Sequence, residues 1–225
     1  MVTGCAHKGY GDPELPVAGK VLGTTVHTRD AEELRYVVLR ELTDRHAREQ
    51  GIVVTQAEKD AYVRHVQETL AKDREQKAAR RTELTGKLAA GGLPEAEHTR
   101  LATEVAMLDD FLAALGDTDS ATADPQEAEA RQQVAAAFIL QWKINRALYR
   151  QYGGRIIFQQ GGPEPLDAYR CFLEEAQSRG DFRIVNKALE AAFWRYYRNE
   201  GIHSFYPRGS GDDAQVFDTP PWLSR

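Results

Sequence analysis

Cysteine is almost absent from this 225-residue sequence, which contains only Cys5 and Cys171. Two cysteines cannot form the several disulfides of a small disulfide-rich scaffold, so that class is excluded. Long apolar runs are also lacking, since no stretch approaches the ~20 residues of a membrane-spanning helix. Basic residues are outnumbered, with 29 Lys and Arg against 34 Asp and Glu, and the net charge is -5. A general nucleic-acid binder needs clustered basic residues, so no nucleic-acid partner is expected.

Spacings typical of metal ligands are missing as well. The six histidines include no HExxH pair and no Cys–His ligand set, so the sequence predicts neither a metal nor another cofactor. His46 and His65 lie among charged residues of predicted helices, and we interpret both as solvated helix surface.

The most site-like cluster lies near the C-terminus, in "NEGIHSFYP" at 199–207. It brings Glu200, His203, Ser204 and Tyr206 into one turn-prone segment. A Ser–His–Glu relay also needs a nucleophile elbow or an oxyanion hole, and the flanking residues offer neither. We therefore favour hydrogen bonding at a helix end, with catalysis by these residues as an alternative.

The first residues raise the question of lipidation. Residues 2–5, "VTGC", resemble the last four residues of a bacterial lipoprotein signal, in which small residues precede the acylated cysteine. The apolar segment of such a signal does not precede them here. Two interpretations stay open: Cys5 as the site of a lipid anchor to a membrane, and Cys5 as a free thiol. Residues 1–16 contain glycine, proline and charged residues, which predicts a flexible tether.

Helical patterns dominate the rest of the chain. β-Branched residues around Gly23 predict a short strand or extended arm over 17–26. Thr28 or Asp30 can serve as the N-cap of a first helix, which Gly51 ends as a left-handed cap. A capping box at "TQAE", 55–58, begins a long second helix. The apolar face of the first helix consists of Leu34, Val37, Val38 and Leu42.

The second helix and the one after it are expected to form a hairpin over about 56–115. "GGLP" at 91–94 predicts the turn between them. The returning helix repeats apolar residues at spacings of four and three, as in a coiled-coil seam. These residues are Leu101, Val105, Leu108, Leu112 and Leu115. We therefore predict a projecting antiparallel hairpin, followed by a polar linker over 116–125.

A short apolar run interrupts the helices in "YGGRIIFQQGGPEP", 152–165. Before it, an aromatic-rich helix is predicted over about 127–152, and its wide apolar face indicates a central position. After it, helices are predicted over about 164–179 and 185–199. The tail at 208–225 has no periodic pattern, and it is either mobile or held on the surface by Phe217 and Trp222.

Residues 17–63, "VAGKVLGTTVHTRDAEELRYVVLRELTDRHAREQGIVVTQAEKDAYV", resemble the N-terminal chaperone module of SurA-like, parvulin-associated periplasmic proteins. The shared order is an extended arm, a capped helix and a "GIVVTQAE"-like connector to a second helix. The resemblance covers 17–70 well and 127–152 loosely. It implies a mainly α-helical SurA-N-like domain in the periplasm or another extracytoplasmic compartment, closed by the helix at 127–152.

In that family a parvulin-type prolyl isomerase domain often follows. Here "RIIFQQ", the helix predicted after it and then "RGDF" at 179–182 look like the first strand and first helix of such a domain. The segment is short for the whole domain, and the first strand carries Ile156, Ile157 and Phe158 where a histidine is expected. A glycine-rich segment of the "GGDLG" type is absent too. We therefore expect a small, catalytically silent α(+β) appendage over 153–207, with peptidyl-prolyl isomerase activity as the enzymatic alternative.

These observations predict a chaperone or assembly factor that binds unfolded or partly folded polypeptides and performs no reaction on them. Aromatic side chains bury large apolar areas, so a groove between the N-terminal helices and the 127–199 region would suit such clients. The alternative is an interaction subunit that docks one dedicated partner through the hairpin. The candidate peptide-binding residues are Val38, Leu42, Phe138, Trp142, Tyr149, Phe193, Trp194 and Tyr197.

Overall fold

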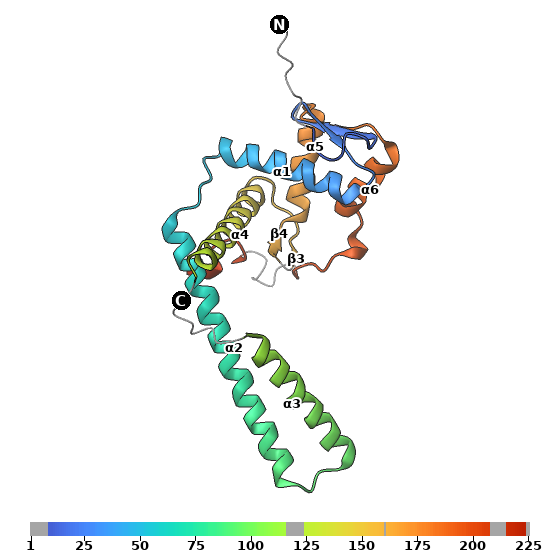
Figure 1. The fold of residues 1–225 in the computed structure, drawn as a ribbon. Helices are drawn as coiled ribbons and strands as arrows, with labels where there is room; N and C mark the ends of the chain where they lie inside the picture. The colour runs from blue at the N-terminus through green and yellow to red at the C-terminus, as the bar shows by residue number, and fades with distance from the viewer. Residues whose placement is uncertain (1–8, 116–123, 160, 208–214, 224–225) are drawn as a thin grey trace. The chain divides into compact units, whose positions relative to one another are not determined.

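The computed structural model describes residues 9–115, 124–159, 161–207 and 215–223 (Figure 1). These residues are mainly helical with small sheets, in agreement with the expected fold class. They form two compact units: unit 1 contains 1–54 and 137–220, and unit 2 contains 55–136 and 221–225. The helices are α1 (Ala31–Glu49), α2 (Gln56–Ala90), α3 (Glu95–Leu115), α4 (Pro125–Tyr152), α5 (Leu166–Ser178) and α6 (Lys187–Arg198), and the strands are β1 (Val17–Val21), β2 (Thr24–His27), β3 (Ile157–Gln159), β4 (Gly162–Glu164) and β5 (Phe182–Ile184).

Unit 1 begins with the predicted extended arm, which folds into the antiparallel hairpin β1–β2. Leu22 and Gly23 form the turn with φ values of 48° and 84°. Positive φ at both turn residues matches the twist of the flanking strands. On its other side β1 pairs with β5 in antiparallel register, so the strand order is β2-β1-β5. A strand near the C-terminus therefore completes the sheet that the N-terminal arm begins.

The predicted helix boundaries at α1 and α2 are confirmed. The Asp30 side chain accepts a hydrogen bond from the Glu32 backbone N–H at 2.7 Å, and Gly51 has a φ of 63° just beyond α1. Thr55 and Glu58 form a complete capping box at the start of α2. Each cap satisfies backbone groups that a helix end leaves without intrahelical partners.

One hydrophobic core joins both ends of unit 1. It is built from β1, β2, α1, the second half of α4, α5, β5 and α6. Residues 153–207 therefore do not form the separate appendage that we expected. Helices α5 and α6 each bury an apolar face in the core that they share with α1, β1, β2 and α4. The central members of this core are Leu34, Val38, Leu42, Leu148, Phe172, Leu173, Phe182 and Phe193.

The interruption at 152–165 is the reversal between α4 and α5. Gly153 and Gly154 follow α4 with φ values of 64° and 94°, a region that glycine enters at little cost. Arg155 then donates from its backbone N–H and from Nε to Asp167 at 2.9 and 2.8 Å. The strands β3 and β4 form a short antiparallel pair, and Ile157 points into the core. The predicted strand is thus confirmed as one arm of a compact connector.

The two glycines make a matched pair for testing this connector. A Cβ at Gly153 would meet open space, whereas one at Gly154 would lie 2.4 Å from the Asp167 Cβ. We expect Gly153→Ala to lower the free energy of unfolding by about 1–2 kcal/mol through backbone strain alone. Gly154→Ala should cost at least about 1 kcal/mol more, because it also displaces Asp167. Urea unfolding of both variants measures the difference, and equal costs would contradict the close approach.

In unit 2, α2 and α3 form the predicted antiparallel hairpin around a turn with positive φ at Gly91 and Gly92. Leu84 and Leu101 are buried between the helices, and Arg80 Nε donates to Glu104 at 2.9 Å across them. The other seam residues, Val105, Leu108, Leu112 and Leu115, are only half-buried. A pair of helices alone therefore leaves much of its apolar seam accessible.

Candidate functional site

Most of the eight predicted peptide-binding residues are buried. Five of them, Val38, Leu42, Phe193, Trp194 and Tyr197, belong to the core of unit 1. The structure gives these five a packing role, and a binding role for them stays a prediction that would require the core to open. The other three lie on α4, where Trp142 is buried, Tyr149 is half-buried and Phe138 is 41% exposed.

Helix α4 presents two different faces in unit 1. One face enters the core through Ile144 and Leu148. The other carries Phe138, Trp142 and Tyr149, which recur at intervals of four and seven residues and so share one side of the helix. We call Trp142, Arg146 and Tyr149 the aromatic strip.

A buried polar network fixes the orientation of α4. The Tyr169 hydroxyl on α5 donates to Asn145 Oδ1 at 2.6 Å, and Gln141 Nε2 donates to the Tyr169 oxygen at 2.8 Å. Asn145 Nδ2 donates to the Pro163 carbonyl at 2.8 Å. Because rotation of α4 would leave these buried groups without partners, the network holds the aromatic strip away from the core.

The aromatic strip is occupied by the protein's own tail. The Phe217 ring lies with its centroid 6.2 Å from that of Trp142 and 5.2 Å from that of Tyr149. Phe217 is only 3% exposed. Arg146 lies over the Trp142 ring and reaches the Asp218 carbonyl at 3.4 Å. One face of α4 thus holds an aromatic side chain together with a backbone carbonyl next to it.

The sequence predicted two members of this strip, but it did not indicate the role of Arg146 or the position of Phe217 on the strip. The aromatic periodicity of α4 pointed to Trp142 and Tyr149. Arg146 was missed, although its position between them on the same face is the signal that could have found it. Phe217 was recognised as a possible surface anchor of the tail, but nothing in the sequence assigns its partner.

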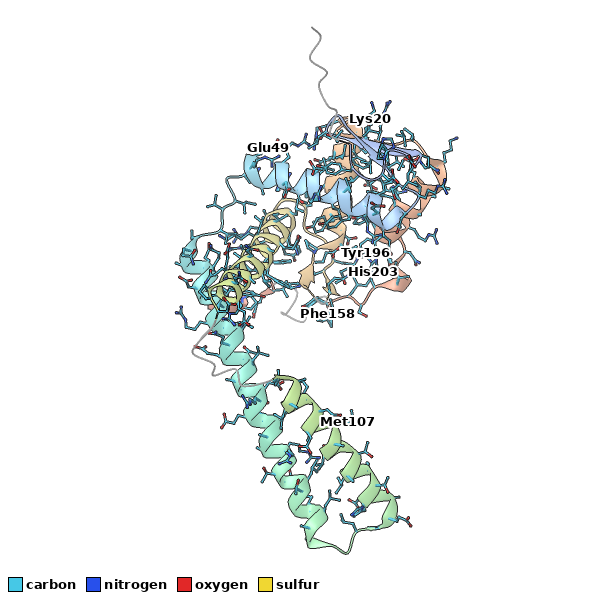
Figure 2. All side chains as sticks on the ribbon, viewed as in Figure 1. Lys20, Glu49, Met107, Phe158, Tyr196 and His203 are labelled. Atoms are coloured by element: carbon cyan, nitrogen blue, oxygen red, sulfur yellow. The ribbon has the colours of Figure 1, made fainter. Side chains whose placement is uncertain are left out.

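The cluster at 199–207 does not assemble a catalytic relay. Glu200 pairs with Arg155 at 2.7 Å, and Tyr206 stacks on Phe158 at a ring distance of 3.7 Å. The His203 ring lies beside Tyr196 in Figure 2, and its Nε2 bonds the Tyr196 backbone carbonyl at 2.6 Å. The three side chains serve three different structural contacts. Hydrogen bonding at the helix end, the favoured interpretation, describes His203 correctly.

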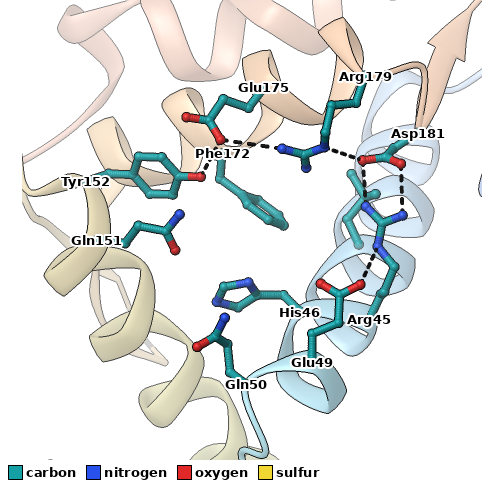
Figure 3. Close-up of a pocket in the computed structure, with 11 residues that line it drawn as sticks. Arg45, His46, Glu49, Gln50, Gln151, Tyr152, Phe172, Glu175, Arg179 and Asp181 are labelled. Carbon is teal, nitrogen blue, oxygen red and sulfur yellow. Dashed lines mark hydrogen bonds and ion pairs between the residues drawn. The ribbon is translucent and has the colours of Figure 1, made fainter.

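A second feature of unit 1 is a polar cavity of about 290 Å³ between α1, the end of α4 and α5 (Figure 3). His46 lies in it with its ring against Phe172, at a centroid distance of 5.4 Å. The expectation that His46 is solvated surface is wrong, since the residue is only 7% exposed. It faces the unit because the α1 positions Leu42 and His46 are one turn apart on the buried side.

Ion pairs form one wall of this cavity. Arg45 bonds both carboxylate oxygens of Asp181, at 2.8 and 2.6 Å, and these bonds lower the pKa of Asp181. Arg179 bridges Asp181 and Glu175 at 3.0 and 3.4 Å. Tyr152 donates to Glu175 at 2.8 Å, and burial together with this hydrogen bond raises the pKa of Tyr152 to about 12.

Other classes of site find no support in the described residues. No group of three or more His, Cys, Asp or Glu there is arranged to hold a metal ion. Within the same residues, no helix combines the length and apolar character that crossing a membrane requires. Cys5, the predicted lipidation site, lies outside the described part of the chain.

Comparison with known proteins gave no match of any kind. No protein-family model matches the chain, and neither a curated protein nor a solved structure does.

The burial of His46 predicts a specific pH dependence. Burial lowers the pKa of His46 below the 6.5 of the unfolded chain, so the unfolded state binds the proton first. The contribution of neutral His46 to the free energy of unfolding is therefore complete above pH 6.5. It decreases as the pH falls through that value, by at most about 1.4 kcal/mol per pH unit. We expect His46→Gln to show a shallower loss of stability between pH 7 and 5 than the wild type. Parallel curves would contradict a buried neutral His46.

Proposed function

We propose that this protein is an extracytoplasmic polypeptide-binding chaperone or assembly factor, SurA-like in its helical module and without isomerase chemistry. The observation that carries the proposal is the packing of the Phe217 ring against the rings of Trp142 and Tyr149. A surface that holds one aromatic-bearing segment of this chain offers the same contacts to an aromatic-bearing segment of another protein.

The energetics favour weak and reversible capture. One aromatic side chain buries 150–250 Å², worth roughly 4–6 kcal/mol at about 25 cal/mol per Å². Association of a separate chain costs an estimated 4 kcal/mol or more, so a client needs several apolar residues to bind. The tail avoids this association cost because it is tethered. It therefore competes with clients and selects for those with extended apolar segments.

Arg146 adds a contact that does not depend on sequence. In the occupied strip its guanidinium reaches a backbone carbonyl of the tail. A carbonyl is present in every residue of a client, so this contact accepts any sequence that places an aromatic ring on the strip. Aromatic rings with a generic backbone contact suit a factor that receives many different unfolded chains.

Removal of the tail contact should increase client binding. We expect Phe217→Ala to suppress the aggregation of several unrelated unfolded proteins at about tenfold lower concentration than the wild type. A tenfold change corresponds to about 1.4 kcal/mol in the free energy of client binding, which the tail no longer opposes. Light scattering during dilution from denaturant measures the effect, and circular dichroism verifies the fold of each variant.

Two variants control this experiment. The double variant Trp142→Ala/Phe217→Ala has the same altered tail but lacks the indole ring of the aromatic strip. It should therefore not suppress aggregation better than the wild type. Phe158→Ala removes an exposed aromatic elsewhere in unit 1 and should behave as the wild type. The proposal fails if Phe217→Ala gains nothing, or if the double variant protects clients as well as the single one.

A second candidate function is docking of one dedicated partner through the α2–α3 hairpin. The observation that favours it is Met107, which is 68% exposed on α3 (Figure 2). Phe111, one turn further on, is 36% exposed with Lys77 over its ring. An exposed methionine next to half-buried apolar seam residues is typical of a surface that binds the apolar face of a partner helix. In this case the protein would leave the aggregation of unrelated proteins unchanged.

A further inference from the structure

We propose that the polar cavity of unit 1 binds a small neutral ligand that carries a carboxamide group. This inference goes beyond the proposed function and does not depend on it, since the aromatic strip is a different surface of the unit. The cavity measures about 290 Å³, the size range of a small molecule or a single side chain. Its ligand class follows from which lining groups already have partners and which do not.

The charged lining groups all have partners. Arg45 is held by Asp181 and Glu49, and Arg179 is held by Asp181 and Glu175. A carboxylate or phosphate ligand would have to break these pairs while facing three carboxylates and two guanidiniums. An amine would have to draw a carboxylate away from its arginine. Either ligand would lose existing charge-assisted bonds, which are the stronger kind.

The uncommitted groups are neutral. His46 Nε2 is buried and has no hydrogen-bond partner in the described residues. The side-chain amides of Gln50 and Gln151 line the same cavity, and Figure 3 shows them on the side of the His46 ring away from the ion pairs. A buried polar atom without a partner destabilises the fold, so a ligand that bonds it gains affinity from this atom.

A carboxamide complements this set of groups. Its donor N–H group and its acceptor oxygen are attached to the same carbon, which is the arrangement that another primary amide pairs with. A neutral imidazole offers either a donor or an acceptor at Nε2, according to its tautomer, so His46 accommodates whichever atom faces it. Leu42 and Phe172 supply apolar contact for the alkyl part of the ligand.

Three matched fragments test the ligand class. Propionamide, propionate and propylamine have similar sizes and differ mainly in the polar group. We expect propionamide alone to shift the His46 ring signals in NMR titrations of the full chain, at concentrations on the order of millimolar. Equal or tighter binding of propionate or propylamine, or no binding of propionamide, would overturn the proposal.

Two exposed glutamines provide a variant and its control. Gln151→Ala should weaken propionamide binding about threefold to tenfold, the loss of one hydrogen bond. Gln67→Ala removes an exposed glutamine of α2 and should bind as the wild type. His46→Leu should abolish binding, and if that variant does not fold, Gln151→Ala carries the test. Wild-type affinity in Gln151→Ala would contradict the assigned geometry.

The ligand has two possible sources, which a peptide distinguishes. A short peptide with one glutamine, compared with its glutamate counterpart, should displace propionamide if the amide belongs to a polypeptide side chain. If propionamide binds and neither peptide displaces it, the ligand is a free small amide. Both results support a carboxamide site. Neither depends on the aggregation assay, so failure here is distinguishable from failure of the proposed chaperone function.

Discussion

The buried side of α4 is the constraint on which the rest of unit 1 depends. Ile144 and Leu148 enter a core that α1, α5 and α6 share, and the Asn145–Tyr169 network fixes the rotation of the helix. A helix with one side committed in this way must turn its other aromatic residues elsewhere. Trp142 and Tyr149 therefore form an apolar surface outside the core, and Phe217 packs against it.

The same core also shapes the polar cavity. Leu42 and Phe172 belong to the core and line the cavity as well, so His46 lies where apolar packing ends and the ion pairs of Arg45 and Arg179 begin. Unit 1 thus combines a rigid interior with two places where packing is incomplete. One is filled by a segment of the chain itself, and the other leaves a buried nitrogen without a partner. Incomplete satisfaction of this kind occurs at functional sites more readily than in a core optimised for stability alone.

Local features were predictable from the sequence because their causes are local. The Asp30 cap, the Thr55–Glu58 capping box and the α2–α3 hairpin each depend on residues close in the chain. The pairing of β5 with β1 was not predictable, since three-residue strands carry no register signal over such a separation. The same limit explains the binding residues. Aromatic periodicity identifies an apolar face but not its partner, so Phe193 in the core and Trp142 under the tail looked alike.

The most direct test of the account is whether a client and the tail exclude each other on α4. A fluorine label on the Phe217 ring reports its environment by ¹⁹F NMR. We predict a signal shifted by the rings of Trp142 and Tyr149 in the free protein, which moves to the position of a solvent-exposed ring when an unfolded client is added. A client that binds while the Phe217 signal stays unchanged would contradict the proposal that the aromatic strip is the binding surface.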